Sequence, residues 1–169
     1  MAGRPREARR KITSWAALAR IVRQAGRRRR TVVFTNGCFD LLHAGHLTLL
    51  QQARRQGDVL IVGINSDTSV RALKGAHRPL LPQRDRALLL AGLECVDYVT
   101  VFSERTPQRL IERVRPHVLV KGADWASGQV VGREVVQQSG GRVVRIPLRK
   151  GCSTTRLIAR IQRHGTPQR

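Results

Sequence analysis

The chain is poor in cysteine and has no long apolar run. Its 169 residues include three cysteines, Cys38, Cys95 and Cys152, which form neither a CxxC pair nor a Cys/His cluster with zinc spacing. Such an odd, scattered set fits reduced thiols better than a disulfide framework. No segment approaches the ~20 apolar residues of a membrane span, and no apolar stretch follows the basic N-terminus to make a signal peptide. We therefore expect a cytoplasmic protein without membrane association.

Aromatic and acidic residues are also scarce. Aromatic residues make up 4% of the chain, and 11 Asp and Glu stand against 32 Lys and Arg, for a formal net charge of +21. A charge of this size can indicate nucleic-acid binding. However, all but four of the basic residues are arginine, their runs lie mainly near the N-terminus at 4–11 and 27–30, and few rings are available to stack on bases. We expect a solvated basic surface whose field favours anionic substrates, and no nucleic-acid partner.

Hydrophobic periodicity alternates between strands and helices along the whole chain. The predicted strands are 31–35, 58–64, 97–102, 117–120 and 142–146. The predicted helices are 14–24, one from the histidine motif to 55, 67–73, 82–92, one capped by Thr106 with Pro107 at its first helical position, 134–138 and 153–162. This order predicts an α/β fold: a single Rossmann-like, doubly wound domain with a five-stranded parallel sheet. We place the domain at 12–165, after a flexible basic N-terminus at 1–11.

Four polar segments follow predicted strands or begin a helix at the same edge of this sheet. They are the histidine motif with Thr35–Asp40 before it, Asn65–Asp67, Lys121–Asp124 and Gly151–Thr155. Ligands of doubly wound sheets bind beyond the carboxyl ends of the strands, where the strand order reverses. The sequence therefore predicts one binding site at this edge.

The motif His43-Ala44-Gly45-His46 opens a helix directly after the first strand. A helix N-terminus offers backbone N–H donors and positive potential to an anion, and two imidazoles three residues apart can face the same anion. Gly45 removes a side chain that would hold a phosphate at a distance. The alternative is that the histidines only cap and pack the helix end. The strand before the motif, together with Asn36 and Asp40, favours catalysis at a phosphate.

Other polar residues at this edge have simpler alternatives. Ser153, Thr154 and Thr155 exceed the needs of an ordinary N-cap, which favours phosphate binding. Lys74, Arg78 and Lys121 lie in expected loops but could be plain surface, and Asp67 could be an N-cap. Cys38 fits a small buried residue better than a reactive thiol. The sequence contains no GxGxxG, GxxxxGK[ST], GxSxG or HExxH pattern.

The segment Asn36–His46 resembles the signature of the HxGH nucleotidyltransferase superfamily. The fuller set of motifs is similar to the adenylyltransferases of ADP-heptose synthesis, in order from about 31 to 161. The shared segments are Asn65–Asp67, Lys74-Gly75 with Arg78-Pro79, Val96–Val99, Leu119–Asp124 and Gly151–Thr155. Cytidylyltransferases for glycerol phosphate and choline phosphate place an arginine three residues before the last motif glycine, where this chain has Leu148.

The resemblance implies transfer of an adenylyl group from ATP to D-glycero-β-D-manno-heptose 1-phosphate in the bacterial cytoplasm, for lipopolysaccharide. It implies a separate heptose kinase and a possible homo-oligomer. Magnesium is expected to bind mainly through phosphates, with Asp40 as a possible ligand. The implied catalytic residues are His43, His46 and Lys74. The implied nucleotide-binding residues are Thr35, Asn36, Gly37, Phe39, Gly45, Lys121, Gly122, Asp124, Ser153, Thr154 and Thr155. The implied substrate-binding residues are Asp40, Asn65, Asp67 and Arg78.

An ionised sugar phosphate needs no general base, so the reaction would depend on positioning and charge stabilisation. Three alternatives remain open from the sequence. One is a cytidylyltransferase, or another nucleotidyltransferase, acting on a different phosphorylated alcohol or heptose. The second is a nucleotide-binding protein without catalysis, and the third is a basic nucleic-acid-binding protein.

Overall fold

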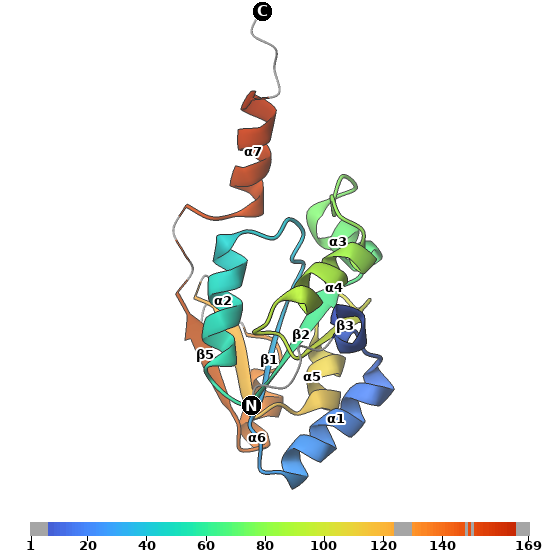
Figure 1. The fold of residues 1–169 in the computed structure, drawn as a ribbon, viewed down its shortest axis with the longest axis vertical. Coiled ribbons are helices and arrows are strands. Elements are labelled where there is room, and N and C mark those ends of the chain that lie inside the picture. Colours follow the sequence, from blue (N-terminus) through green and yellow to red (C-terminus); the bar gives the residue numbers. More distant parts are fainter. Residues whose placement is uncertain (1–6, 124–129, 148, 150, 165–169) are drawn as a thin grey trace, which may run out of the picture.

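The computed structural model describes residues 7–123, 130–147, 149 and 151–164 as an α/β fold. A five-stranded, all-parallel sheet in the order β3-β2-β1-β4-β5 lies between two layers of helices (Figure 1). Its strands are β1 (Val32–Gly37), β2 (Val59–Asn65), β3 (Tyr98–Phe102), β4 (Val118–Gly122) and β5 (Arg142–Ile146). The predicted doubly wound parallel sheet is confirmed, with its five strands near the expected positions.

Helices cover both faces of the sheet. They are η1 (Ala8–Lys11, a 3-10 helix), α1 (Trp15–Arg27), α2 (Ala44–Arg54), α3 (Asp67–Lys74), α4 (Gln83–Gly92), α5 (Gln108–Val114), α6 (Arg133–Gln138) and α7 (Thr154–His164). Among the described residues, no helix combines the length and apolar character needed to cross a membrane. In Figure 1, α7 projects past the edge of the sheet where the strands end.

The sheet separates two apolar cores. Val33 of β1 packs in the core formed with α2 and α4, whereas its neighbour Phe34 packs in the core formed with α1, α5 and α6. Successive side chains of a strand point to opposite faces, so one short strand supplies both cores. All seven residues of β2 are buried, as expected for a parallel strand covered on both sides. A Cβ at Gly63 would lie 2.9 Å from Cζ of Phe34, so this glycine leaves space for the ring.

Several element ends differ from the sequence-based prediction. Strand β1 continues to Gly37, because its pairing with β2 extends to Gly37 opposite Ile64. Helix α1 runs through Gly26 to Arg27. Pairing with a neighbouring strand thus extends β1 beyond the point where local residue preferences would end it.

Two predicted helix caps also differ in the structure. Ser66, rather than Asp67, caps α3, with its Oγ accepting from the Ser69 N–H at 3.2 Å. Pro107 is the residue before α5 and not its first helical residue. In both cases the helix keeps its predicted place and the cap shifts by a single residue.

Part of the segment expected to be flexible has a defined place. Ala8–Lys11 form η1, and Lys11 Nζ donates to the carbonyl of Leu93 at 3.1 Å, just after α4. The next residue, Ile12, makes a parallel bridge with Val99 of β3. The described N-terminal residues therefore pack against the end of α4 and pair with β3, whereas the domain bounds themselves stay a prediction.

The two-core arrangement predicts a sharp contrast between two adjacent leucines of α4. Leu90 is fully buried and Leu89 is 48% exposed. We expect Leu90→Ala to lower the free energy of unfolding by about 2–5 kcal/mol, because it removes buried methyl groups and leaves a cavity. Leu89→Ala, as the matched control, should change it by about 0.5 kcal/mol or less. Urea unfolding of both variants measures the difference, and equal losses would contradict the burial of Leu90.

Candidate active site

The strand order reverses at β1, which has β2 on one side and β4 on the other. The carboxyl ends of these strands bring Asn36, Asn65 and Lys121 to one edge of the sheet. Lys121 Nζ donates to Asn36 Oδ1 and so joins the ends of β1 and β4. The sequence-based expectation that these segments converge at the reversal point is met by this geometry.

The two motif histidines stack on each other at the N-terminus of α2. Their ring centroids lie 3.8 Å apart with planes inclined by 17°. His43 caps the helix: its Nδ1 accepts from the backbone N–H of His46 at 3.3 Å. An accepting Nδ1 carries no proton in a neutral imidazole, so the proton of His43 lies on Nε2. The cap therefore fixes the tautomer that leaves Nε2–H free to donate to a ligand.

Both imidazoles are held in the neutral form. Burial, followed by the neighbouring charge of His43, lowers the pKa of His46 from 6.5 to about 4. Burial likewise lowers the pKa of His43. The rings of Phe39 and His46 pack in an edge-type contact, with centroids 5.1 Å apart and planes inclined by 60°. Nδ1 of His46 is buried and has no hydrogen-bond partner among the described residues. Near neutral pH the pair thus offers N–H donors without a prior positive charge.

Gly45 allows a second segment to reach the histidines. A Cβ at this position would lie 2.9 Å from Cβ of Cys152 and 3.0 Å from Nδ1 of His43. The space expected to admit a phosphate is therefore bordered by Cys152, a residue to which the sequence assigned no role. A side chain at position 45 would require Cys152 or the His43 ring to move, so the glycine lets two of the predicted motifs lie close together.

The segment beside Gly45 begins α7 with a conventional cap. Ser153 Oγ accepts from the Arg156 N–H at 3.2 Å. Thr154 is half-buried and Thr155 is exposed in the first turn that follows. Because Ser153 alone satisfies the cap, the two threonine hydroxyls are additional polar groups at a helix N-terminus.

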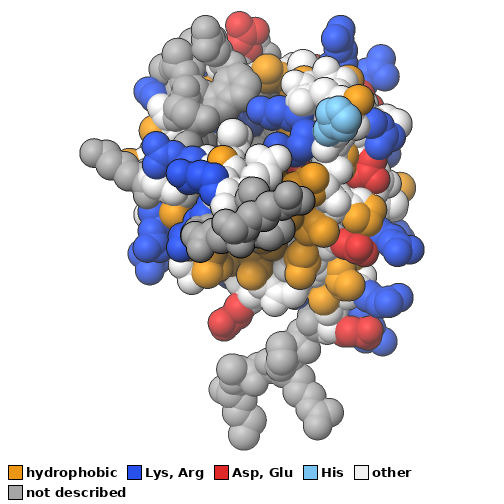
Figure 2. All heavy atoms as spheres, turned by 90° about the horizontal axis from the view of Figure 1, so that it is seen from above, with side chains coloured by type: hydrophobic (Ala, Val, Ile, Leu, Met, Phe, Trp, Pro, Cys, Tyr) orange, Lys and Arg blue, Asp and Glu red, His pale blue; other side chains and the backbone are white. Residues whose placement is uncertain are grey.

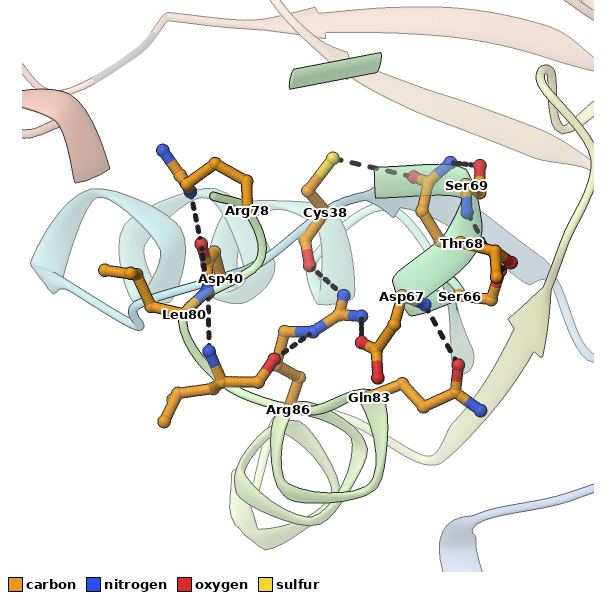
Figure 3. A network of polar contacts seen from close by, with 12 residues as sticks. Cys38, Asp40, Ser66, Asp67, Thr68, Ser69, Arg78, Leu80, Gln83 and Arg86 are labelled. Carbon is orange, nitrogen blue, oxygen red and sulfur yellow. Dashed lines mark hydrogen bonds and ion pairs between the residues drawn. The ribbon is translucent and has the colours of Figure 1, made fainter. Parts of the chain in front are cut away.

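Asp40 and Arg78 bind each other, although the sequence assigned both to the substrate (Figure 3). Asp40 is 2% exposed, and its Oδ2 accepts from Arg78 Nε at 2.6 Å. The N–H groups of Leu80 and Leu81 donate to Oδ1 at 2.8 and 3.0 Å. Burial alone would raise the pKa of Asp40, but these hydrogen bonds and the Arg78 charge lower it. Both carboxylate oxygens are occupied, so Asp40 fastens the 78–81 loop in this structure and is not presented to a metal ion.

Asn65 and Asp67 belong to the same polar network. Asn65 Nδ2 donates to Ser69 Oγ at 2.9 Å, and Asp67 Oδ1 accepts from Arg86 Nη2 at 2.8 Å. The backbone N–H of Asp67 donates to Gln83 Oε1 at 3.0 Å. These contacts hold the start of α3 against the start of α4, beside the loop between β1 and α2.

Arg86 is the residue that the sequence-based prediction missed. It is fully buried, and its guanidinium donates to three segments of the chain (Figure 3). The missed signal was its spacing: Arg86 lies on the same helical face as Ala87 and Leu90, which are buried in a core. A charged residue on the apolar face of a helix needs buried partners.

The thiol of Cys38 lies inside this network. Its Sγ is 3.9 Å from Asn65 Oδ1. Burial raises the pKa of Cys38, although the charges of Lys74, Arg86 and Arg78 act in the opposite direction. A raised pKa keeps the thiol protonated near neutral pH, which favours the small buried residue over the reactive nucleophile.

The remaining predicted residues lie at the ends of strands and helices around this edge. Thr35 is buried within β1, Gly122 is buried at the end of β4, Gly37 ends β1, and Lys74 is exposed at the end of α3. Asp124 lies outside the described residues. Within the part of the chain that the structure describes, no three His, Cys, Asp or Glu side chains gather as a metal site.

Basic side chains are frequent around the face on the side of α7. In Figure 2, Lys and Arg side chains outnumber Asp and Glu around this face. A positive potential of this kind raises the local concentration of anionic ligands and speeds their association. The surface charge and the helix N-termini thus favour the same class of ligand.

The chain is similar to proteins of known family. The cytidylyltransferase-like family matches residues 34–160. The bifunctional protein HldE of Geotalea uraniireducens (strain Rf4) is 55% identical over 152 residues, which cover 90% of this chain and 31% of that protein. The protein of the same name from Syntrophotalea carbinolica is 53% identical over 151 residues, covering 89% of this chain and 31% of its own length. The chain thus spans about a third of these curated relatives.

Solved structures share the fold. The lipopolysaccharide core biosynthesis protein from Thermoplasma volcanium GSS1 superposes with a TM-score of 0.62 at 25% identity, covering 72% of this chain and 99% of that one. Pantothenate synthetase from Thermus thermophilus superposes with a TM-score of 0.53 at 23% identity, covering 81% of this chain and 61% of the synthetase. The latter likeness concerns the fold alone.

The half-buried, neutral His46 predicts how stability depends on pH. Between pH 6.5 and about 4 the unfolded chain binds a proton at His46 that the folded chain does not. The free energy of unfolding should therefore fall as the pH is lowered through this range. In urea unfolding, His46→Gln should give a shallower pH dependence, and His77→Gln, at an exposed position, should match the wild type. Equal slopes for wild type and His46→Gln would contradict the prediction.

Proposed function

The chain belongs to the cytidylyltransferase-like family, and we propose that it transfers an adenylyl group from ATP to D-glycero-β-D-manno-heptose 1-phosphate. The products are ADP-heptose and pyrophosphate. The single observation that carries the proposal is the stacked, neutral histidine pair at the N-terminus of α2, in contact through Gly45 with the start of α7. Two helix N-termini directed to one place supply N–H donors for a polyphosphate.

The proposed chemistry is an in-line displacement at the α-phosphorus. A phosphate oxygen of the sugar attacks the α-phosphorus of ATP and forms the new P–O bond. The bond from the α-phosphorus to the oxygen that bridges the α- and β-phosphates breaks, and pyrophosphate leaves with the negative charge. The nucleophile is already ionised near neutral pH, so no protein group has to remove a proton. The contribution of the chain is then to orient the two substrates and to stabilise charge in the transition state.

The histidines are suited to that task in this proposal. Nε2–H of His43 is free to donate because its Nδ1 accepts from the helix. His46 is neutral in the free protein, and an arriving phosphate would raise its pKa and strengthen its hydrogen bond. Preorganised donors of this kind act without reorganisation as negative charge builds.

Other residues take the roles implied by their places. Thr154 and Thr155 bind the β- and γ-phosphates at the start of α7. Lys74, exposed at the end of α3, binds the transferring or sugar phosphate. Thr35, Asn36, Lys121 and Gly122 form the nucleotide side of the site at the ends of β1 and β4. Asp124 remains the candidate for the ribose.

Two residues predicted to bind substrate take a different role in this proposal. Asp40 and Arg78 are occupied by each other, so we assign Asp40 to holding the 78–81 loop. Arg78 binds Asp40 through Nε. Any role of Arg78 toward the substrate therefore belongs to its Nη atoms. The side chain of Asp67 is 26% exposed while bound to Arg86, and its second oxygen is the candidate partner of a sugar hydroxyl.

Magnesium belongs to the proposal as a companion of the nucleotide. The described residues do not form a carboxylate cluster that fits the ion, because Asp40 is fully engaged and no group of three ligands gathers. We therefore expect Mg²⁺ to be held through the phosphates, where it supplies charge neutralisation.

Support for the sugar comes from the relatives and from the motif set. The similar proteins HldE are named bifunctional, and one solved relative is named for lipopolysaccharide core biosynthesis. The heptose 1-phosphate that this site would consume has to be made by a sugar kinase, and a homo-oligomer is compatible with the proposal. The cytoplasm, where ATP is supplied, is the proposed compartment.

A pyrophosphate-release screen tests the reaction. ATP, CTP and GTP are each combined with heptose 1-phosphate, glycerol 3-phosphate and phosphocholine in the presence of Mg²⁺. We expect rapid release only from ATP with heptose 1-phosphate. Release from CTP with another phosphorylated alcohol would replace the proposal by a cytidylyltransferase. Nucleotide binding with no release from any pair would leave a binding protein.

Removal of one histidine donor tests the site. We expect His46→Ala to lower kcat by about 10²–10³-fold, because one preorganised donor to the transition state is lost. Leu47→Ala, at a 39% exposed neighbouring position of α2, is the matched control and should retain activity. Steady-state pyrophosphate release measures both variants. A His46→Ala variant within tenfold of the wild type would refute the role of this histidine.

A further inference from the structure

We propose that Arg86 is a positioning residue for the histidine pair, acting through the carbonyl of Cys38 and the ring of Phe39. The side chain lies on α4 and binds Asp67 at the edge of the site, but the sequence assigned it no role. Its role in turnover rests on the proposed function. Its mechanical link to His46 rests only on the structure.

The guanidinium of Arg86 holds three segments at once. Nε donates to the carbonyl of Leu81 at 3.0 Å, Nη1 to the carbonyl of Cys38 at 2.6 Å, and Nη2 to Asp67 Oδ1 at 2.8 Å (Figure 3). These partners belong to the loop before α4, the β1–α2 loop and the first turn of α3. A planar fork with fixed donor directions can satisfy all three, and a single ammonium group cannot do so in the same geometry.

The contact with Cys38 is the one that reaches the histidines. Cys38 directly precedes Phe39, which has φ 45°, a value that non-glycine residues adopt rarely. A backbone in this region persists when its surroundings hold it. Here the Cys38 carbonyl is bound to Arg86 on one side of Phe39, and the Asp40 carboxylate is bound to the 78–81 loop on the other. The two anchors determine where the Phe39 ring lies.

The Phe39 ring in turn covers His46. Phe39 is 4% exposed, and its ring makes an edge-type contact with the imidazole, with centroids 5.1 Å apart. If the Cys38 carbonyl loses its anchor, the ring shifts and the imidazole gains contact with water. A small displacement of a catalytic donor is enough to slow a reaction that depends on orientation.

The surroundings of Arg86 support a positioning role for its charged group. The side chain is fully buried beside the core residues of α4, where a leucine or methionine would pack without needing partners. Its carboxylate partner, Asp67, is itself at the edge of the site. The other two bonds go to loop carbonyls and so define backbone positions.

The test compares two arginines of one helix. Arg86→Lys keeps the positive charge but loses the fork, whereas Arg84→Lys changes a side chain that is 86% exposed. Titration of the histidine ring protons by NMR reports the environment of His46 in each folded variant. We expect Arg86→Lys to raise the pKa of His46 by about one unit or more from about 4, since the ring cover loosens. Arg84→Lys should leave it unchanged. A folded Arg86→Lys protein with an unchanged His46 pKa would overturn the proposal.

Two further measurements keep the outcome decisive. If Arg86→Lys does not fold, Asp67→Asn weakens the same anchor and should raise the pKa of His46 by a smaller amount. An unchanged His46 pKa in Asp67→Asn also overturns the proposal.

In kinetics, Arg86→Lys should lower kcat by about tenfold or more, with KM for ATP changed less than about threefold. An unchanged kcat would count against the proposal. If the wild type releases no pyrophosphate, the proposed function fails, and the NMR titration still decides whether Arg86 positions His46.

Discussion

The fully buried guanidinium of Arg86 binds two loop carbonyls and a carboxylate, and the geometry of the site depends on those three contacts. Without them, the β1–α2 loop, the start of α3 and the loop before α4 would lose the group that binds all three. An arginine in a core is tolerated when each of its donors has a partner. Because the guanidinium donates in fixed directions, its three partners are held in fixed positions, and the backbone around them is well defined.

Around this centre the site separates structural charges from functional ones. The Asp40–Arg78 and Asp67–Arg86 pairs are largely enclosed and hold loops together. The histidines remain neutral, since burial lowers their pKa values. A site for phosphates benefits from this division. In the proposed function, the ion pairs keep the loops in place, and the neutral histidines and helix N-termini donate hydrogen bonds to the phosphates.

The basic surface acts at longer range. Most of the net charge of +21 lies on arginines outside the polar network, and the face on the side of α7 is rich in basic side chains. Such a field attracts anionic substrates in general and does not select among them. Selection has to come from the few groups at the ends of β1, β2 and β4 and at the starts of α2 and α7. Composition alone therefore indicates the sign of the ligand's charge and little of its identity.

Hydrophobic periodicity and chain direction, which are local properties of the sequence, were enough to predict the alternating strands and helices, the parallel sheet and the edge where the motifs meet. The histidine pair was also predictable, because HxGH after a first strand is a compact pattern. Three contacts emerged only from the folded chain: Asp40 binds Arg78, Cys152 fills the space beside Gly45, and Arg86 anchors Cys38. Those partners are separated by 38 to 107 positions in the chain. Whether a carboxylate faces a ligand or a neighbouring arginine depends on which distant segment packs beside it, and no local pattern records that.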